Sequence, residues 1–380
     1  MLGAIIGDIA GSRWEFTPTN DYNFELFSKK NGFTDDTICT VAVADAILHH
    51  SDDYGKYIHD WCRKYPRPMG GYGGRFAEWV RSDHPEPYGS FGNGSAMRVS
   101  PVAWAFSSRE DVLEAARLTA ACTHNHPEGI KGAQTVALAI HYARQLSAGY
   151  EKTIGEDDLK QLMTLVTQFS GYRIDFRKED VENRFNETCQ GTVPVALWVI
   201  RQSDGFEDAV RRAVSLGADA DTLGAIVGSI AEALWGIPND LRIFAMGFLP
   251  DEMKTVISQF QVTTDSIKSF AERNIDYLSH HYKLDSSYRA FFGPKFPNDC
   301  RKYGFEMDIG QSFIEAYGEC AWHHLDCLEP IIDEVDDINI IGSALFSKWR
   351  FFNHWSCSPP EEDDIKWFLL LLRRLRDLSE

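Results

Sequence analysis

The chain has 380 residues, which is enough for a large domain with an appendage. With 44% hydrophobic and 25% charged residues, its composition is that of an ordinary globular protein and argues against long disorder. The 56 acidic residues outnumber the 38 basic ones, and a net charge of −18 repels phosphate backbones and excludes sequence-independent nucleic-acid binding.

The N-terminal stretch MLGAIIGDIAGSRWEF is apolar, but it carries Asp8 and has no basic leader, so it is unlike a signal peptide. No run in the chain reaches the roughly eighteen apolar residues that a membrane helix needs. The eight cysteines are spread along a long chain, which is typical of reduced cytosolic thiols rather than of a disulfide framework. We therefore expect a cytoplasmic protein with no membrane contact.

Apolar residues recur at helical spacing along most of the chain, and several of these segments are apolar nearly all round, as buried helices are. The clearest segments are residues 34–48, 111–121, 129–147, 206–216 and 222–235. Runs with strand periodicity and hairpin dipeptides are missing. The pattern predicts an all-α fold, a helical domain followed by a mostly helical C-terminal module.

Glycines four residues apart occur near the N-terminus and again after Asp221. They are Gly3, Gly7 and Gly11, and then Gly224 and Gly228. On a helix this spacing leaves a smooth groove that another backbone can approach closely. Because each glycine costs roughly 1 kcal/mol relative to alanine in a helix, the series needs a packing reason. We expect the two helices to lie at the centre of the domain, against each other.

The amino-acid composition changes at two places along the chain. Between about 65 and 101 it is rich in Gly and Pro, which is typical of long functional loops. After about 284 it has its own aromatic cluster and an amphipathic end, while Cys320 and Cys327 flank two histidines at a spacing unlike common zinc sites. We predict a main domain over 1–283 that carries the chemistry and a module of unknown function over 284–380 that supplies no catalytic residue.

Two acidic blocks each open a buried helix: TDDT at 34–37 and GADADT at 217–222. Thr34 suits an N-cap and the acids suit the helix dipole, but capping alone does not need two adjacent carboxylates. Buried acids this close together must be neutralised by protons, basic partners or metal. Four carboxylates and two threonines suit Mg²⁺ or Mn²⁺, ions that often occur in pairs about 4 Å apart in hydrolases.

Two further motifs have both a functional and a structural interpretation. GNGSAMR at 92–98 offers backbone N–H groups, a hydroxyl and an arginine that could hold phosphate oxygens, although on its own the motif is better explained as a tight turn before a helix. His124 follows an apolar helix, where it could complement the helix dipole without a catalytic part.

In this order, GDIAGS with Glu15, TDDT, GNGSAMR, the TH of 123–124 and GADADT resemble the ADP-ribosylglycohydrolase family of the dinitrogenase-reductase-activating glycohydrolase type, over about residues 1–240. The resemblance implies an all-α catalytic domain with two Mg²⁺ ions that removes ADP-ribose from modified targets. The implied metal ligands are Thr34, Asp35, Asp36, Asp219, Asp221 and Thr222. Glu15 and Asp36 would be catalytic, and the implied substrate-binding residues are Asn93, Gly94, Ser95, Met97 and His124.

The expected partner is an ADP-ribosylated protein or another ADP-ribose conjugate, and the expected cofactor is Mg²⁺, with Mn²⁺ as the alternative. Members of the family that act on ADP-ribosyl-arginine carry an aspartate in the loop after the first metal helix, whereas this loop has no carboxylate before Glu78. An arginine-linked substrate is therefore in doubt. Two alternatives remain, a hydrolase of small ADP-ribose conjugates and a non-catalytic ADP-ribose binder.

Overall fold

All regular secondary structure in the described part of the protein is helical. The computed structural model describes residues 1–106, 108–147, 153–264, 267–280, 310–352 and 361–379, together with Phe296, Cys300, Tyr303 and Phe305. Within these residues there is no strand, and a bridge between Gly92 and Thr188 is the extent of sheet-like pairing. The all-α prediction is confirmed.

The chain divides into two compact units. Unit 1 comprises Met1–Leu146 and Ile154–Gln261, and unit 2 comprises Ser147–Thr153 and Val262–Glu380. The division falls earlier than the boundary at 283 that we expect from the sequence, because α16 (Ile267–His280) packs against α22 (Glu362–Leu378).

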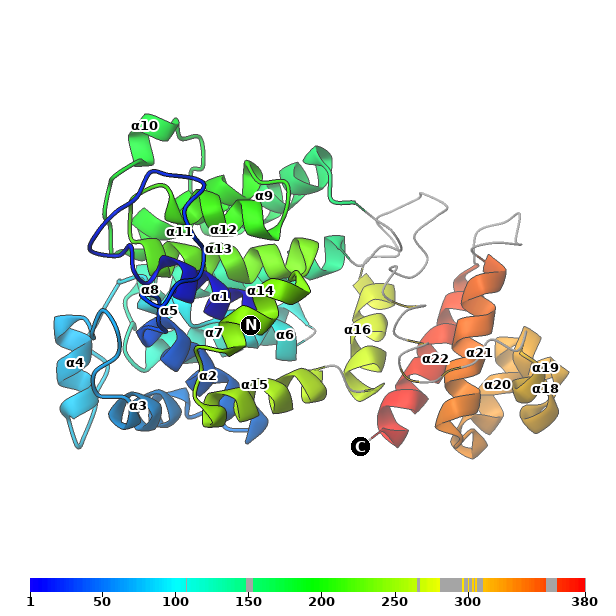
Figure 1. Ribbon diagram of the computed structural model, residues 1–380. Coiled ribbons are helices and arrows are strands. Elements are labelled where there is room, and N and C mark those ends of the chain that lie inside the picture. Colours follow the sequence, from blue (N-terminus) through cyan, green and yellow to red (C-terminus); the bar gives the residue numbers. More distant parts are fainter. Residues whose placement is uncertain are drawn as a thin grey trace. The chain divides into compact units, whose positions relative to one another are not determined.

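In the described residues, unit 1 carries α1 to α14 and most of α15, and most of these helices surround α1 and α13 (Figure 1). Their bounds are α1 Leu2–Gly11, α2 Asp35–Leu48, α3 Tyr54–Lys64, α4 Gly74–Arg81, α5 Gly94–Met97, α6 Ser100–Ala105, α7 Arg109–Ala121, α8 Pro127–Leu146, α9 Glu156–Ser170, α10 Lys178–Val181, α11 Cys189–Arg201, α12 Phe206–Val214, α13 Ala220–Trp235, α14 Asn239–Met246 and α15 Asp251–Thr264. The five segments predicted from periodicity correspond to α2, α7, α8, α12 and α13.

Helix α4 lies inside the stretch that the sequence analysis assigns to loops. Its sequence GRFAEWVR buries Phe76, Trp79 and Val80, which share one helical face. Phe76 stacks on Trp79 with ring centroids 5.5 Å apart, and His59 of α3 contacts the edge of Trp79. Burial of these aromatic side chains outweighs the breaking tendency of the surrounding glycines.

Helices α1 and α13 touch backbone to backbone through their glycines. A Cβ atom added to Gly3, Gly7 or Gly11 would lie 2.2, 1.9 or 2.2 Å from the carbonyl oxygen of Gly228, Gly224 or Ala220. The predicted contact between the two helices is confirmed. The pairing runs antiparallel, so the C-terminal end of α1 lies beside the N-terminal end of α13.

Unit 2 has its own hydrophobic core, built around Trp367, Phe313 and Phe346. Besides α16 and α22 it contains α18 Gln311–Tyr317, α19 Glu319–His323, α20 Leu325–Leu328, the 3₁₀ turn η1 Glu329–Glu334 and α21 Ile338–Arg350. Cys320 and Cys327 form a disulfide, so the expectation of reduced thiols is wrong for this pair. No helix among the described residues is both long and apolar enough to cross a membrane.

Candidate active site

A cavity of about 480 Å³ opens in unit 1 where the N-terminal ends of α2, α5 and α13 meet. All the residues that line it belong to unit 1. Of the residues singled out in the sequence, the lining includes Glu15, Asp35, Asp36, Asn93, Gly94, Met97, His124, Asp219, Asp221 and Thr222. Two acidic blocks that are far apart in the chain, together with the glycine-rich motif, therefore face one space.

The glycine contact explains why the acidic blocks meet. Because α1 runs antiparallel to α13 with Gly11 against Ala220, the chain leaves α1 beside the residues that open α13. Glu15 therefore lies close to Asp219 and Asp221. Burial and, after it, the charge of Asp219 raise the pKa of Glu15.

Asp8 of α1 ties the start of α2 to this assembly. Its carboxylate accepts hydrogen bonds from the backbone N–H groups of Thr34 at 3.0 Å and Thr37 at 3.1 Å, and from both threonine hydroxyls. Asp8 itself is fully buried. Sequence reasoning missed this role, although a charged residue in an otherwise apolar helix was the available signal.

Thr34 does not line the cavity, although the sequence analysis expects it to be a metal ligand. Its hydroxyl donates to Asp8 at 2.8 Å and accepts from the backbone N–H of Asp36 at 3.2 Å. The N-cap interpretation of Thr34 is therefore confirmed, whereas its part in binding a metal stays a prediction.

Only some of the carboxylate oxygens in the cavity have hydrogen-bond partners. Asn93 Nδ2 donates to Asp219 Oδ2 at 2.7 Å, and Thr222 Oγ1 donates to Asp36 Oδ2 at 3.3 Å. By contrast, Glu15 Oε2, Asp36 Oδ1 and Asp221 Oδ1 are buried without a hydrogen-bond partner. Unpaired buried oxygens are costly, so these three atoms mark a place where a ligand supplies what the protein does not.

Burial, reinforced by the neighbouring negative charges, raises the pKa of these acids. Burial is the larger cause in each case, and it raises the pKa of Asp35 to about 8, of Glu15 to about 7 and of Asp219 to about 6. The pKa values of Asp36 and Asp221 also lie well above the ordinary range. No Lys or Arg among the described residues forms an ion pair with these acids, so protons or a cation from outside the chain must offset their charge.

The acids are not gathered as a closed metal cage. No group of three or more His, Cys, Asp or Glu side chains in the described part is close enough to hold a metal ion as it stands. The candidate metal-ligating atoms are nevertheless all oxygens, and three of them lack a hydrogen-bond partner, which fits a hard divalent cation.

The glycine-rich motif lines the cavity next to the acids, since Asn93 is hydrogen-bonded to Asp219. Asn93 N donates to the carbonyl of Glu187 at 2.7 Å, which pins the turn before α5. Ser95 points away from the cavity, because its hydroxyl donates to the carbonyl of Gly129 at 2.7 Å. The structure thus places Gly94 and Met97 at the cavity, where the resemblance predicts them, but places Ser95 behind it.

Several lining residues were not found from the sequence. Phe16 and Phe185 are exposed aromatics at the mouth, with 71% and 48% of their surface accessible, and Glu187 lies beside them. Gly70 has a φ of 78°, and a Cβ there would lie 2.4 Å from Glu15 Oε2, so glycine lets the carboxylate approach. For Gly70 the glycine-rich composition of 65–101 was the available signal, but it names no single residue, and nothing in the sequence analysis singled out the other three.

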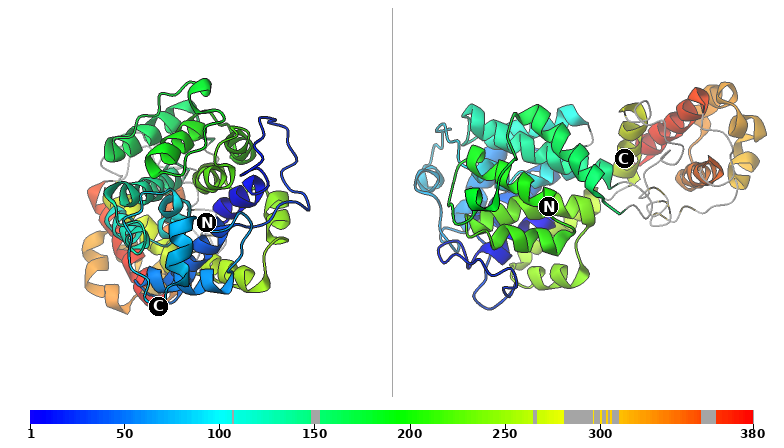
Figure 2. Two further views of the ribbon diagram at one scale, coloured as in Figure 1. Left: turned by 90° about the vertical axis from the view of Figure 1, so that its left-hand side faces the viewer. Right: turned by 90° about the horizontal axis from the view of Figure 1, so that it is seen from above.

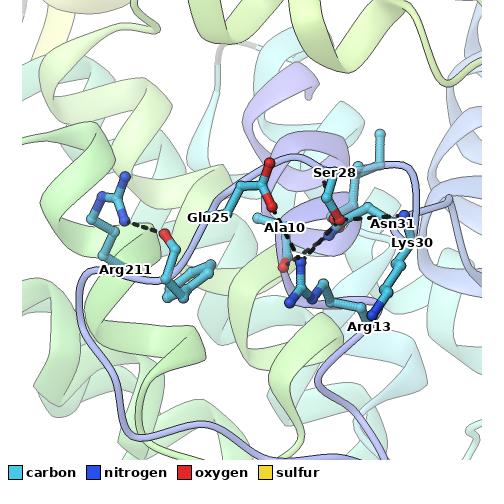
Figure 3. A network of polar contacts seen from close by, with 9 residues as sticks. Ala10, Arg13, Glu25, Ser28, Lys30, Asn31 and Arg211 are labelled. Carbon is cyan, nitrogen blue, oxygen red and sulfur yellow. Dashed lines mark hydrogen bonds and ion pairs between the residues drawn. The ribbon is translucent and has the colours of Figure 1, made fainter.

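A polar network holds the loop between α1 and α2, which carries Glu15 (Figure 3). Asn31 Nδ2 donates to two carbonyls near the end of α1, at 2.7 and 3.4 Å. Arg13 donates to the hydroxyl of Ser28 at 2.9 Å, and Arg211 of α12 donates to a loop carbonyl at 2.7 Å. The loop runs along the outside of unit 1, dark blue in both views of Figure 2, and is nevertheless fixed at several points.

Comparisons with known proteins agree on one family. A family model described as ADP-ribosylglycohydrolase matches residues 1–278. ADP-ribosylhydrolase ARH3 of Homo sapiens is 26% identical over 311 residues, covering 62% of this chain and 84% of its own. ADP-ribosylarginine hydrolase Tri1 of Pseudomonas putida is 27% identical over 283 residues, covering 62% and 70%.

Two further matches extend this picture. ADP-ribosyl-dinitrogen reductase glycohydrolase of Rhodospirillum rubrum is 24% identical over 258 residues, covering 62% of this chain and 84% of its own. A solved structure described as an ADP-ribosylglycohydrolase-related protein complex has a TM-score of 0.53 and 25% identity, covering 69% of this chain and 95% of that one.

Proposed function

The chain belongs to the ADP-ribosylglycohydrolase family of enzymes, and on that premise we propose that it is a magnesium-dependent hydrolase that releases ADP-ribose by cleaving the glycosidic bond at ribose C1. The observation that carries the proposal is the convergence of Glu15, Asp36 and Asp221 on one cavity, each with a buried oxygen that lacks a partner.

The shape of the cavity suits a nucleotide-type ligand. Its volume of about 480 Å³ lies within the range of small-molecule sites. Acids and the glycine-rich motif both line it, so an ADP-ribose can place its ribose toward the acids and its phosphates toward the glycine-rich motif. Backbone donors would then bind the anionic group despite the net negative charge of the protein.

Mg²⁺ would be held by Asp35, Asp36, Asp219, Asp221 and Thr222, with Thr34 as the remaining predicted ligand. A bound divalent cation offsets the buried negative charge, polarises the ribose oxygens and acidifies a water. We expect two ions, and Mn²⁺ would fit the same oxygen donors.

The chain's own residues supply the rest of the mechanism. The glycosidic bond breaks through a state with positive charge on the ribose, which the fixed carboxylates of Asp36 and Asp221 stabilise. Glu15 Oε2, one of the three unpaired oxygens, can accept a proton from a water attacking C1 and return it to the departing acceptor group as the glycosidic bond breaks. Gly70 leaves room for that oxygen to lie against the loop.

Two alternatives use the same cavity, namely hydrolysis of small ADP-ribose conjugates and binding of ADP-ribose without turnover. The presence of Glu15 beside the acidic blocks favours turnover over binding alone. Cytoplasmic location stays a prediction; the free thiols of Cys39, Cys62, Cys122 and Cys189 are in keeping with it, whereas the disulfide between Cys320 and Cys327 is not.

An assay on three substrates tests the function. With Mg²⁺ present, we expect release of free ADP-ribose from serine-linked or nucleic-acid-linked ADP-ribose, quantified by chromatography. Arginine-linked ADP-ribose should be the poorest substrate, because loop residues 70–74 offer no carboxylate for a guanidinium. If arginine-linked ADP-ribose is instead the best substrate, the Glu187→Gln variant will show whether the carboxylate of Glu187 at the cavity mouth binds the guanidinium. Binding of ADP-ribose with no release from any of the three would establish the non-catalytic alternative.

Removing the cation should make stability depend on pH. Unfolded carboxyls titrate near pH 4, but folded Glu15 and Asp35 have pKa values of about 7 and 8. The folded state therefore holds more protons between about pH 5 and 8, and the free energy of unfolding falls as pH rises through this window. In EDTA, Tm should drop over that range, whereas Mg²⁺ should remove most of the drop. An identical pH profile with and without Mg²⁺ would contradict the metal site.

A further inference from the structure

We propose that Arg98 and Thr123 act as positioning residues that hold His124 neutral with its proton on Nε2, so that the ring presents an N–H donor to an oxygen of the bound ligand. The inference rests on the proposed function only for the identity of that ligand, ADP-ribose. The tautomer itself is a property of the free protein and can be measured without any substrate.

Arg98 is a buried cation in the cavity wall that has no carboxylate partner among the described residues. Its side chain is 1% exposed, and its Nη2 donates to the carbonyl of Thr119 at 2.8 Å and to Thr123 Oγ1 at 2.7 Å. A longer contact of 3.7 Å joins Nη2 to the sulfur of Cys122. A guanidinium carries no lone pair to share, so Thr123 Oγ1 must be the acceptor in this hydrogen bond.

The hydroxyl of Thr123 lies 2.6 Å from Nδ1 of His124. Either atom could carry the shared proton, but the nearby Arg98 decides between them. Donation from a guanidinium polarises the hydroxyl and makes it a better donor and a poorer acceptor. The positive charge also favours a lone pair on Nδ1 over an N–H dipole pointing toward it. Thr123 therefore donates to Nδ1, and the neutral ring must carry its proton on Nε2.

The Nε2 atom lies on the cavity side of the ring. A Cβ atom added to Gly92 or Gly94 would lie 3.4 or 3.3 Å from it, so the glycine-rich motif and the imidazole lie close together. The structure records no hydrogen-bond partner for Nε2 among the described residues. His124 is 5% exposed and lines the cavity. An N–H that faces the cavity beside the glycine-rich motif is suited to a phosphate or ribose oxygen.

Electrostatics supports the neutral form. Burial and, to a smaller degree, the charge of Arg98 lower the pKa of His124 well below its ordinary value. A neutral imidazole with its proton on Nε2 donates to an oxygen acceptor, whereas the other tautomer would turn a lone pair toward that oxygen. The choice of tautomer thus determines whether His124 attracts or repels the ligand.

The test combines NMR with binding. In the ¹⁵N-labelled full chain, long-range ¹H–¹⁵N spectra distinguish a protonated from an unprotonated ring nitrogen, and His124→Gln assigns the signals. We expect the wild type to show protonated Nε2 and unprotonated Nδ1. Thr123→Val removes the donor at nearly constant shape, and should replace this pattern by a mixture of tautomers and weaken ADP-ribose binding about tenfold, the equivalent of one hydrogen bond. Thr123→Ser retains the hydroxyl and should restore both.

The outcomes distinguish the relay, by which we mean the hydrogen-bonded chain from Arg98 through Thr123 to His124, from the proposed function. Protonated Nδ1 in the wild type, an imidazolium at neutral pH, or an unchanged tautomer in Thr123→Val would each overturn the relay, even if ADP-ribose binds well. The expected tautomer in a wild type that binds no ADP-ribose would support the relay and remove the proposed ligand. Because Thr123→Ser and Thr123→Val share one site, a fold defect common to both would appear in their melting curves, and the wild-type spectrum would still decide the proposal.

Discussion

Replacing Asp36 by asparagine is expected to lower the rate of ADP-ribose release on the order of a thousandfold at saturating Mg²⁺, since the variant loses a preorganised charge from the reacting centre. Asp221→Asn, in the other acidic block, should lower the rate by a similar factor. The amide is nearly the same shape, but it carries no charge and one of its ends donates rather than accepts. The rate of ADP-ribose release and the Mg²⁺-induced rise in Tm are the two measurements.

The same variants should be more stable than the wild type in EDTA at about pH 8, because each removes a buried negative charge that no ion pair offsets and that leaves one carboxylate oxygen without a partner. A variant whose hydrolysis rate falls while its stability in EDTA rises has lost catalysis without misfolding. Asp157→Asn is the matched control, since Asp157 also lies in the first turn of a helix, α9, but its side chain is fully exposed. Near-normal hydrolysis by Asp36→Asn with Mg²⁺ present would remove the acidic blocks from the mechanism.

Gly7→Ala is expected to cost about 3 kcal/mol of unfolding free energy or to prevent folding altogether. The added Cβ would lie 1.9 Å from the carbonyl oxygen of Gly224 and 2.3 Å from its carbon, and both are backbone atoms that cannot move alone. Separating α1 from α13 would also shift Glu15 away from Asp221, so the Mg²⁺-induced rise in Tm should fall with stability. Urea unfolding monitored by circular dichroism measures the first effect.

Gly205→Ala is the matched control for this substitution. Gly205 precedes α12 with an extended φ of 179°, and a Cβ there would meet nothing within 4 Å. Its effect should stay below about 1 kcal/mol, the cost of a poorer N-cap. A Gly7→Ala protein as stable as the wild type would show that α1 and α13 are not packed at backbone contact.

Local patterns were sufficient to predict much of this protein. The helical spacing of apolar residues predicted α2, α7, α8, α12 and α13, because burial of one face is encoded within a dozen neighbouring residues. Thr34 was recognisable as an N-cap for the same reason. The glycine spacing also predicted the contact between α1 and α13, since three glycines in series weaken a helix unless another backbone packs closely against them.

Only the tertiary structure decided which side chains face the cavity. Asp8 turns Thr34 away from it, Gly129 turns Ser95 away from it, and Arg98 reaches His124 through Thr123. Each of these contacts joins residues brought together by the register of one helix against another, and register depends on packing across the whole domain. A motif carries the kind of residue that the chemistry needs, whereas the direction of each side chain follows from neighbours that lie elsewhere in the chain.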